Sequence, residues 1–221
     1  MKELYFSRGS LEQKSLEMSR ELGEYRRGRA VRFDPAHSAL LVLDMQSYFL
    51  DSSSHAYVPS AAAIMHGIQE LIQAYAARGL CVVFTQHVNS GRDAGLMASW
   101  WRELITAAHP LSAIVPDLDV SAGAVVRKSQ YDAFYRTPLE KMLRRQAATQ
   151  LVICGVLTHL CCETTARSAF MRGFEVLFPI DGTATYTEDF HRASLLNLSH
   201  GFATPVFLKD LLAEVRLGDE H

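Results

Sequence analysis

Short apolar runs rich in β-branched residues alternate with longer helical patterns from about residue 38 onward. This alternation is typical of βαβ units, which build a parallel sheet. Because the runs are almost continuously apolar, helices should cover both faces of that sheet. We therefore expect an α/β fold of three layers, with a six-stranded parallel sheet between two layers of helices. The expected strands are SALLVLDM (38–45), LCVVFTQ (80–86), AVVRK (124–128), QLVICGV (150–156), EVLFPID (175–181) and ATPVFL (203–208).

The longer segments between these runs have the apolar spacing of helices. Several of them end on glycine, which often follows the last helical residue. Thr137 precedes Pro138, a pair typical of a helix start with threonine as N-cap and proline in the first turn. The expected helices are 60–79, 137–148, 161–173 and 187–201.

The chain is long enough for one domain with a full core. Its 221 residues are 48% hydrophobic and 21% charged, which fits a single α/β domain over residues 34–221. Residues 1–33 differ in character, since they are rich in charge and carry only scattered apolar side chains. We interpret this segment as a helical arm that contacts another copy of the chain in a homo-oligomer.

Charge and cysteine usage exclude several classes of partner. The net charge is −2 and no lysine and arginine cluster is long enough to follow a phosphate backbone, so we expect no nucleic-acid partner. The four cysteines lack the paired spacing of a zinc site and the density of a disulfide scaffold. Reduced thiols, and no apolar run of signal-peptide or membrane-span length, predict a soluble cytoplasmic protein without a membrane partner.

Polar side chains stand at the carboxyl ends of the expected strands, where ligands bind in open parallel sheets. Among them an aspartate, a lysine and a cysteine could form a nucleophile site, with the carboxylate as base and the ammonium as electrostatic support. Taken alone, Asp44 could instead cap a turn, and Lys128 could be solvated. The polar residues at these ends are Asp44, Gln46, Gln86, His87, Lys128, Thr158, Cys161 and Asp181.

Helical periodicity separates the two adjacent cysteines, Cys161 and Cys162. If Thr158 is the N-cap, Cys161 lies in the first turn and shares a face with the polar residues at 164, 165 and 168. Cys162 shares its face with the apolar residues at 166, 169 and 170, so it should be buried. The free backbone N–H groups of a helix start favour a thiolate, which predicts a lowered pKa for Cys161.

Three motifs in order carry a resemblance to a known family. LLVLDMQSYFLD with Asp44, VVRKSQYDAFYRTPLEKML with Lys128, and ICGVLTHLCCETTARSAFMRGFEVLFPIDGTAT with Cys161 together resemble the isochorismatase-like cysteine hydrolase superfamily over residues 38–208. This superfamily includes nicotinamidases, N-carbamoylsarcosine amidohydrolase and ureidoacrylate-type amidohydrolases. The resemblance implies that Cys161 is the nucleophile, that Asp44 takes its proton and that Lys128 holds both. It further implies a small-molecule substrate whose C–N bond is opened through a thioester, and a dimer or tetramer.

The resemblance also implies features around the nucleophile. A cis peptide is expected between Val156 and Leu157, with the N–H groups of Leu157 and Cys161 as the oxyanion hole. No cofactor is implied. Nicotinamidases carry a metal held by an aspartate and histidines, and that DxH element is not evident here, although His55 and His87 remain candidate ligands. We therefore expect no metal and a substrate other than nicotinamide.

Two alternative functions stay open. The N-terminal extension and DMQSYFLD look closest to the isochorismatase branch, whose members cleave a vinyl ether without a cysteine nucleophile and usually have a small residue at the position of Cys161. Gln86 matches a glutamine that binds substrate in that branch. The cysteine favours an amidase, with an Asp44-dependent ether hydrolase as the second hypothesis. A catalytically degenerate binding protein is the third.

Aromatic and polar residues near the strand ends are candidates to bind substrate. Adjacent tryptophans and further aromatic rings favour a flat or apolar acyl group. The candidates are Gln46, Phe49, Gln86, His87, Trp100, Trp101, Tyr131 and Phe134.

Overall fold

A computed structural model describes residues 2–23 and 31–217 and confirms the expected parallel sheet. All strand pairs in the described residues are parallel, and the sheet order is β3-β2-β1-β4-β5-β7, with the short β6 paired to β4. The six expected strands are all present, and only β6 had no sequence signal. The strands are β1 (Ser38–Leu43), β2 (Cys81–His87), β3 (Ala124–Lys128), β4 (Gln150–Val156), β5 (Glu175–Pro179), β6 (Thr183–Ala184) and β7 (Thr204–Val206).

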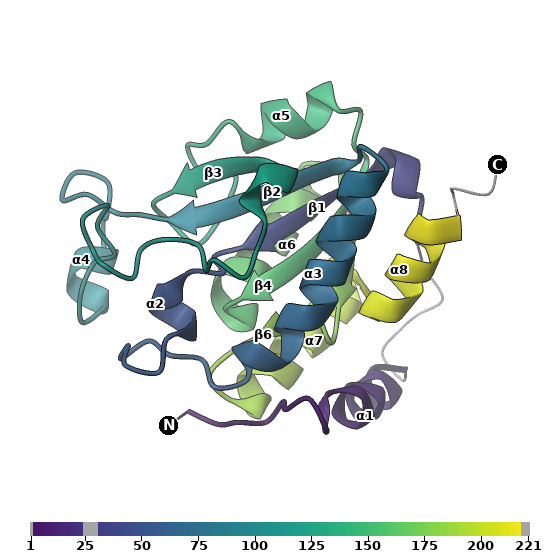
Figure 1. The fold of residues 1–221 in the computed structure, drawn as a ribbon, viewed down its shortest axis with the longest axis horizontal. Helices are drawn as coiled ribbons and strands as arrows, with labels where there is room; N and C mark the ends of the chain where they lie inside the picture. The colour runs from purple at the N-terminus through teal and green to yellow at the C-terminus, as the bar shows by residue number, and fades with distance from the viewer. Residues whose placement is uncertain (1, 24–30, 218–221) are drawn as a thin grey trace.

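Helices cover the sheet on both sides (Figure 1). α3 packs against β1, β2, β4 and α8 on one side, whereas α6 packs against β5 and α7 on the other, where α5 joins it through an ion pair between Glu140 and Arg172. The α-helices are α1 (Leu11–Gly23), α2 (Ser47–Leu50), α3 (Ala61–Ala77), α4 (Met97–Trp100), α5 (Leu139–Arg145), α6 (Glu163–Met171), α7 (Glu188–Gly201) and α8 (Leu208–Leu217). Short 3-10 helices lie at Pro35–His37 and Val120–Ala122.

The four expected helices are confirmed as α3, α5, α6 and α7, but two of their starts differ. α5 begins one residue later than expected, with Pro138 as N-cap. The Thr137 hydroxyl still accepts the Leu139 N–H at 3.3 Å, and it donates to the Ala133 carbonyl oxygen. A π-helical turn over Thr158–Cys162 precedes α6, so the expected α-helical first turn is wider than a regular one.

The strand order reverses between β1 and β4, at the centre of the sheet. The chain continues from β1 toward one edge of the sheet and from β4 toward the other. Such a reversal leaves a crevice beyond the carboxyl ends of the two strands. Leu43 pairs with Gly155, so Asp44 and the segment after β4 emerge side by side. Gly155 has a φ of +112°, and a Cβ there would lie 2.1 Å from the Leu43 carbonyl oxygen. Only glycine therefore allows β1 and β4 to approach in this way.

The N-terminal segment packs on the domain that follows it, and the domain boundary at residue 33 stays a prediction. Tyr5, Phe6, Met18 and Leu22 belong to the same hydrophobic core as the strands. Polar contacts hold α1 to α7 as well, since Lys14 pairs with Glu188. The scattered apolar residues of the N-terminal segment are therefore part of the domain core. A contact of this segment with a second copy of the chain stays a prediction.

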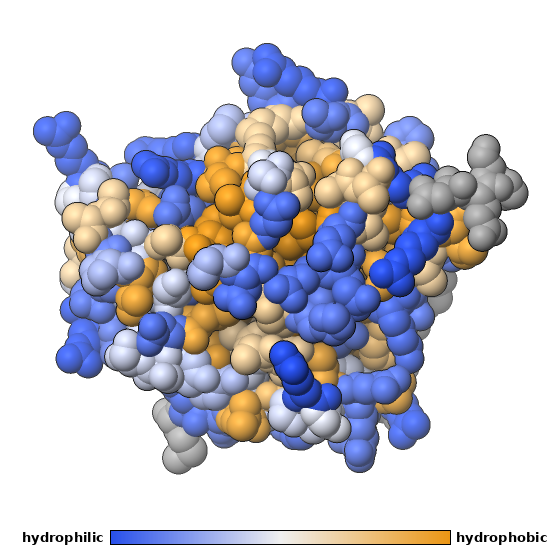
Figure 2. All heavy atoms as spheres, viewed as in Figure 1, coloured by the Kyte–Doolittle hydropathy of each residue, from blue (hydrophilic) through white to orange (hydrophobic). Residues whose placement is uncertain are grey.

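The surface agrees with this arrangement. Figure 2 shows apolar residues gathered over β2 and β3, with hydrophilic residues around them. β3 ends the sheet order and leaves Val125 45% exposed. Within residues 2–23 and 31–217, no helix is long and apolar enough to cross a membrane.

Tyr5→Phe should destabilise the fold by about 1–3 kcal/mol, because it leaves buried polar groups without their partner. The Tyr5 hydroxyl accepts the Thr185 N–H at 2.9 Å and lies 3.1 Å from Nδ1 of His191. Urea unfolding followed by circular dichroism measures the change. Tyr135→Phe, at a ring that is 43% exposed, is the matched control and should change the free energy of unfolding little. Equal effects of the two substitutions would contradict the anchoring role of Tyr5.

Candidate active site

Asp44, Lys128 and Cys161 meet at the carboxyl ends of β1, β3 and β4, in the crevice at the centre of the sheet. Nζ of Lys128 lies 2.6 Å from Oδ2 of Asp44 and 3.3 Å from Sγ of Cys161. All three residues are buried, with exposed fractions of 0%, 2% and 5%. The structure therefore brings together the three residues that the sequence singled out.

Neighbouring strands fix the aspartate. Asp44 follows β1 directly and has a positive φ of 51°, which turns its side chain back toward β2. The Thr85 hydroxyl donates to Oδ1 of Asp44 at 2.6 Å and accepts the Asp44 N–H at 3.1 Å. One threonine within the apolar strand β2 thus sets both the backbone and the carboxylate of Asp44.

The lysine comes from the end of β3, beside the end of β2. His87 and Lys128 are paired in the parallel register of these strands. The Lys128 ammonium donates to the Gln130 carbonyl oxygen at 3.0 Å and lies 3.4 Å from Nδ1 of His87. Nε2 of His87 lies 2.8 Å from Oδ1 of Asn89, which assigns the N–H to Nε2 and leaves Nδ1 as an acceptor for Lys128.

The two adjacent cysteines take different positions on the π-helical turn. Cys161 lines a pocket, whereas Cys162 is fully buried in the core, as its apolar face predicts. Phe170, assigned to the same apolar face, is 50% exposed. The Val156–Leu157 peptide just before the turn is cis, as the resemblance implies.

The charges of Asp44 and Lys128 cancel each other when Cys161 is a neutral thiol. Burial opposes ionisation of Asp44, but the charge of the Lys128 ammonium outweighs it and holds the pKa of that carboxyl below its usual value. The pKa of Lys128 is raised: burial opposes the charged form, and the negative charge of Asp44 outweighs it. Burial, and then the Asp44 charge, raise the pKa of the Cys161 thiol to about 12. The expected lowering of that pKa is therefore wrong, because burial and a carboxylate outweigh the helix start and Lys128.

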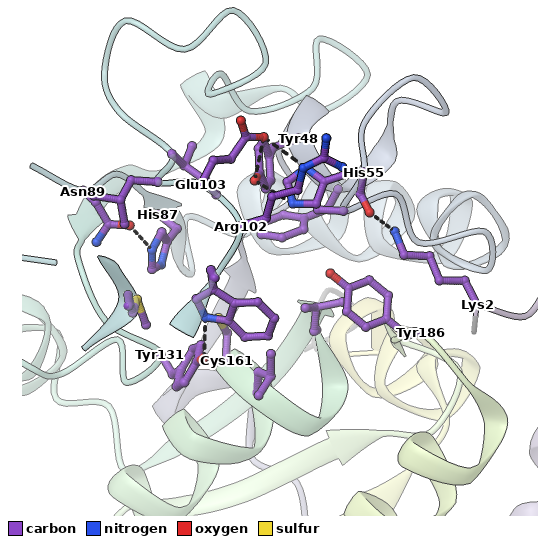
Figure 3. Close-up of a pocket in the computed structure, with 18 residues that line it drawn as sticks. Lys2, Tyr48, His55, His87, Asn89, Arg102, Glu103, Tyr131, Cys161 and Tyr186 are labelled. Carbon is purple, nitrogen blue, oxygen red and sulfur yellow. Dashed lines mark hydrogen bonds and ion pairs between the residues drawn. The ribbon is translucent and has the colours of Figure 1, made fainter. Parts of the chain in front are cut away.

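A pocket of about 250 Å³ opens above Cys161 (Figure 3). Its walls are mainly apolar and aromatic, and Figure 3 shows Lys2, Arg102 and Glu103 on the side away from Cys161, which we call the mouth. His87 is buried in the wall, and burial lowers its pKa to about 4, so this ring is neutral at pH 7. Residues that form the aromatic wall include Tyr48, Phe49, Trp101, Tyr131 and Tyr186.

Comparison with known proteins identifies the family. The model of the isochorismatase domain matches residues 38–210. This chain belongs to the isochorismatase-like hydrolase superfamily. Nicotinamidase 3 of Arabidopsis thaliana is 35% identical over 171 residues, which cover 75% of this chain and 82% of that protein. Enterobactin synthase component B of Escherichia coli is 32% identical over 183 residues, which cover 81% of this chain but only 64% of that protein.

Solved structures of this superfamily share the fold. A cysteine hydrolase from Pseudomonas syringae superposes with a TM-score of 0.82 and 26% identity, over 86% of this chain and 99% of that one. The residues matched by the family model include Asp44, Lys128 and Cys161, but not the N-terminal segment.

In this isochorismatase-family chain, some candidate substrate residues line the pocket and others do not. Phe49, His87 and Tyr131 lie in its wall. Trp100 is 77% exposed and outside the wall, because the short α4 turns its neighbour Trp101 inward, where Trp101 donates to the Tyr131 hydroxyl at 2.7 Å. Phe134 is buried behind the wall, where its ring stacks on Phe174.

The two candidate glutamines support the backbone instead of facing the pocket. Gln46 is fully buried, donates to the carbonyl oxygens of His87 and Ser112, and accepts the His87 N–H at 2.7 Å. Gln86 also donates to the Ser112 carbonyl oxygen, at 2.9 Å. Both amides therefore tie the loop around Ser112 to the first two strands.

The histidines considered as metal ligands do not offer a metal site. Within the part of the chain that the structure describes, one cluster has suitable spacing: ligand atoms of Asp44, His87 and Cys161 all lie within 4.8 Å of one another. Lys128 already contacts all three with its ammonium, which takes the place of a cation. Both ring nitrogens of His55 have partners, since Nδ1 lies 3.0 Å from Glu103 and Nε2 lies 3.4 Å from the Tyr48 hydroxyl. These residues do not fit a metal.

Several residues around the site had no assigned role in the sequence. Thr85 is a polar residue inside an apolar strand, and Asn89 follows His87 by two positions, so both carried a weak signal. Lys2 and Tyr186 line the pocket from opposite ends of the chain, and no sequence spacing connects them.

Asp44→Asn should lower the pKa of the Cys161 thiol, because it removes a negative charge and leaves the Lys128 ammonium nearby. Alkylation of Cys161 by iodoacetamide at pH 8 should therefore accelerate roughly tenfold for each unit of decrease. Tandem mass spectrometry of the modified peptides measures this rate and separates Cys161 from Cys162. Asp210→Asn, on exposed α8, is the control and should not change the rate. Unchanged or slower alkylation in Asp44→Asn would refute this charge balance.

Proposed function

We propose that this chain hydrolyses a C–N bond of a small amide or carbamoyl compound through a thioester on Cys161. The observation that carries this proposal is the position of Cys161 Sγ, at the base of the pocket and 3.3 Å from the ammonium that pairs with Asp44. A nucleophile beside a carboxylate base is the arrangement that acyl transfer needs.

The protonation states of Asp44 and Cys161 support this reaction. As the amide carbonyl carbon reaches Sγ, the thiol proton passes to Asp44, whose lowered pKa keeps it ionised and ready to accept. The N–H groups of Leu157 and Cys161 would receive the oxyanion. The amine then leaves with the proton from Asp44, and a thioester remains on Cys161. Water, deprotonated by Asp44, releases the carboxylic acid and restores the thiol.

Lys128 is not the base in this scheme. Its raised pKa keeps it protonated, so its charge offsets Asp44 in the resting state and offsets charge that develops on sulfur during attack. The neutral ring of His87 supplies an acceptor to this ammonium without adding a competing charge.

The pocket supports a flat substrate. Aromatic rings of Phe49, Trp101, Tyr131 and Tyr186 favour a ring or another planar acyl group beside the reacting carbonyl. Because the chain is similar to a nicotinamidase, nicotinamide should be among the substrates assayed. We still expect a different amide, because the residues of this site do not fit the metal that nicotinamidases carry.

A vinyl ether hydrolase that depends on Asp44 is the second candidate. An ether oxygen needs a proton donor, but the ion pair with Lys128 favours the ionised form of Asp44. Gln86, which would contact substrate in that reaction, is bonded to Ser112 outside the pocket wall. These observations favour the amide reaction.

Cys161→Ala should reduce amide turnover by about 10³-fold or more, because it removes the nucleophile. Ammonia release from nicotinamide, benzamide and carbamoyl compounds measures this, with isochorismate assayed in parallel. Cys162→Ala is the matched control, and it should retain most of the activity because that side chain faces the core. Turnover of isochorismate that survives Cys161→Ala but not Asp44→Ala would favour the ether hydrolase. A chain that turns over nothing in the panel would favour a binding protein.

A further inference from the structure

The N-terminal segment forms part of the pocket wall. Lys2 lies in the wall together with Tyr186 and Cys161, although the residues matched by the family model begin only at 38. The superfamily domain alone therefore does not complete this pocket. Figure 3 shows Lys2 and Cys161 well apart, so Lys2 lines the part of the pocket that is distant from Cys161.

Buried contacts hold this segment in place. The Glu3 N–H donates to the Tyr186 carbonyl oxygen at 2.8 Å. The Ser60 hydroxyl oxygen accepts the N–H groups of Tyr5 and Phe6 at 3.0 and 3.1 Å. Tyr5 and Phe6 are 4% and 0% exposed, so the backbone just after Lys2 is fixed in the core. Lys2 is thus placed at the pocket by a segment whose following residues are anchored in the core.

The ammonium of Lys2 retains capacity to bind an anion. It donates to the His55 carbonyl oxygen and lies 4.8 Å from the centre of the Tyr186 ring. An ammonium has three N–H donors, so further donors remain. None of the carboxylates in the described residues forms an ion pair with Lys2.

Other charges at the mouth do not cancel this one. Glu103 is the acidic residue in the wall, where its carboxylate accepts from the Tyr48 hydroxyl at 3.1 Å and lies 3.0 Å from Nδ1 of His55. Its single negative charge is outnumbered by the positive charges of the same wall. Arg102 adds a second positive charge to the same wall. Asp44 at the base is balanced by Lys128. The mouth of the pocket therefore favours a negative group.

We propose that Lys2 is a specificity-determining residue, whose ammonium binds a carboxylate or similar anionic group at the end of the substrate away from Cys161. The statement that an amide of this substrate reacts at Cys161 rests on the proposed hydrolase function. The preference for an anionic group near Lys2 does not depend on that function. The substrate class is then a small planar amide with an acidic substituent. Lys2 is exposed, so solvent weakens a charge-assisted hydrogen bond to its ammonium, and we expect about a tenfold preference in affinity.

A pair of matched probes tests this proposal by binding. The monoanion of isophthalamic acid has one carboxamide and one carboxylate on a benzene ring, and isophthalamide has two carboxamides. Calorimetry on the full chain with Cys161→Ala, carrying any purification tag at its C-terminal end, should give about tenfold tighter binding of the monoanion. Adding Lys2→Met should remove this preference, whereas adding Lys2→Arg should keep it.

Lys141→Met, on exposed α5, removes the same charge far from the pocket and should leave the preference intact. A preference that survives Lys2→Met, or a chain that never prefers the monoanion because it binds both probes equally or neither, would overturn the proposal. Because binding is measured without turnover, an inactive chain that still shows the Lys2-dependent preference would reject the hydrolase and keep this inference.

Discussion

The ion pair between Lys128 and Asp44 is the interaction on which the rest of the site depends. Its two side chains are completely buried, and burial of isolated charges costs several kcal/mol per ion. The fold offsets that cost with a 2.6 Å contact, the Thr85 hydroxyl, the Gln130 carbonyl oxygen and the neutral ring of His87. Because the pair is neutral overall, the thiol of Cys161 keeps its proton until a substrate arrives. In the proposed reaction, Asp44 as base and Cys161 as nucleophile would therefore be in place without a buried net charge.

The reversal of strand order explains why these groups meet. β1 and β4 diverge in their connections at the centre of the sheet, and Gly155 lets them approach closely enough for Asp44 and the turn with Cys161 to lie side by side. β2 and β3 then bring His87 and Lys128 to the same edge. The aromatic wall comes from the short α2 and from loops beyond these ends, so the sheet fixes Asp44, Lys128 and Cys161 while these segments and the N-terminal segment shape the pocket.

Local sequence predicted much of the fold but less of the pocket. Apolar runs with β-branched residues predicted all six longer strands, and their polar ends predicted the meeting of Asp44, Lys128 and Cys161, because both signals are local. Wall residues depend on which way a loop side chain turns, so Trp101 faces the pocket where Trp100 was also expected, and Gln46 holds backbone instead. The position of Lys2 in the pocket wall could not be predicted, because it depends on tertiary contacts: Lys2 with Tyr186, and the nearby Tyr5 with Ser60. The thiol pKa depends on burial, which periodicity alone does not measure.

Neutron diffraction from deuterium-exchanged crystals at pH 7 tests the central claim most directly, because it locates the protons of the cluster. We expect one deuteron on Sγ of Cys161, three on Nζ of Lys128 and none on the carboxylate of Asp44. A deuteron on Asp44 beside a bare Sγ, or a neutral amine at Lys128, would contradict it.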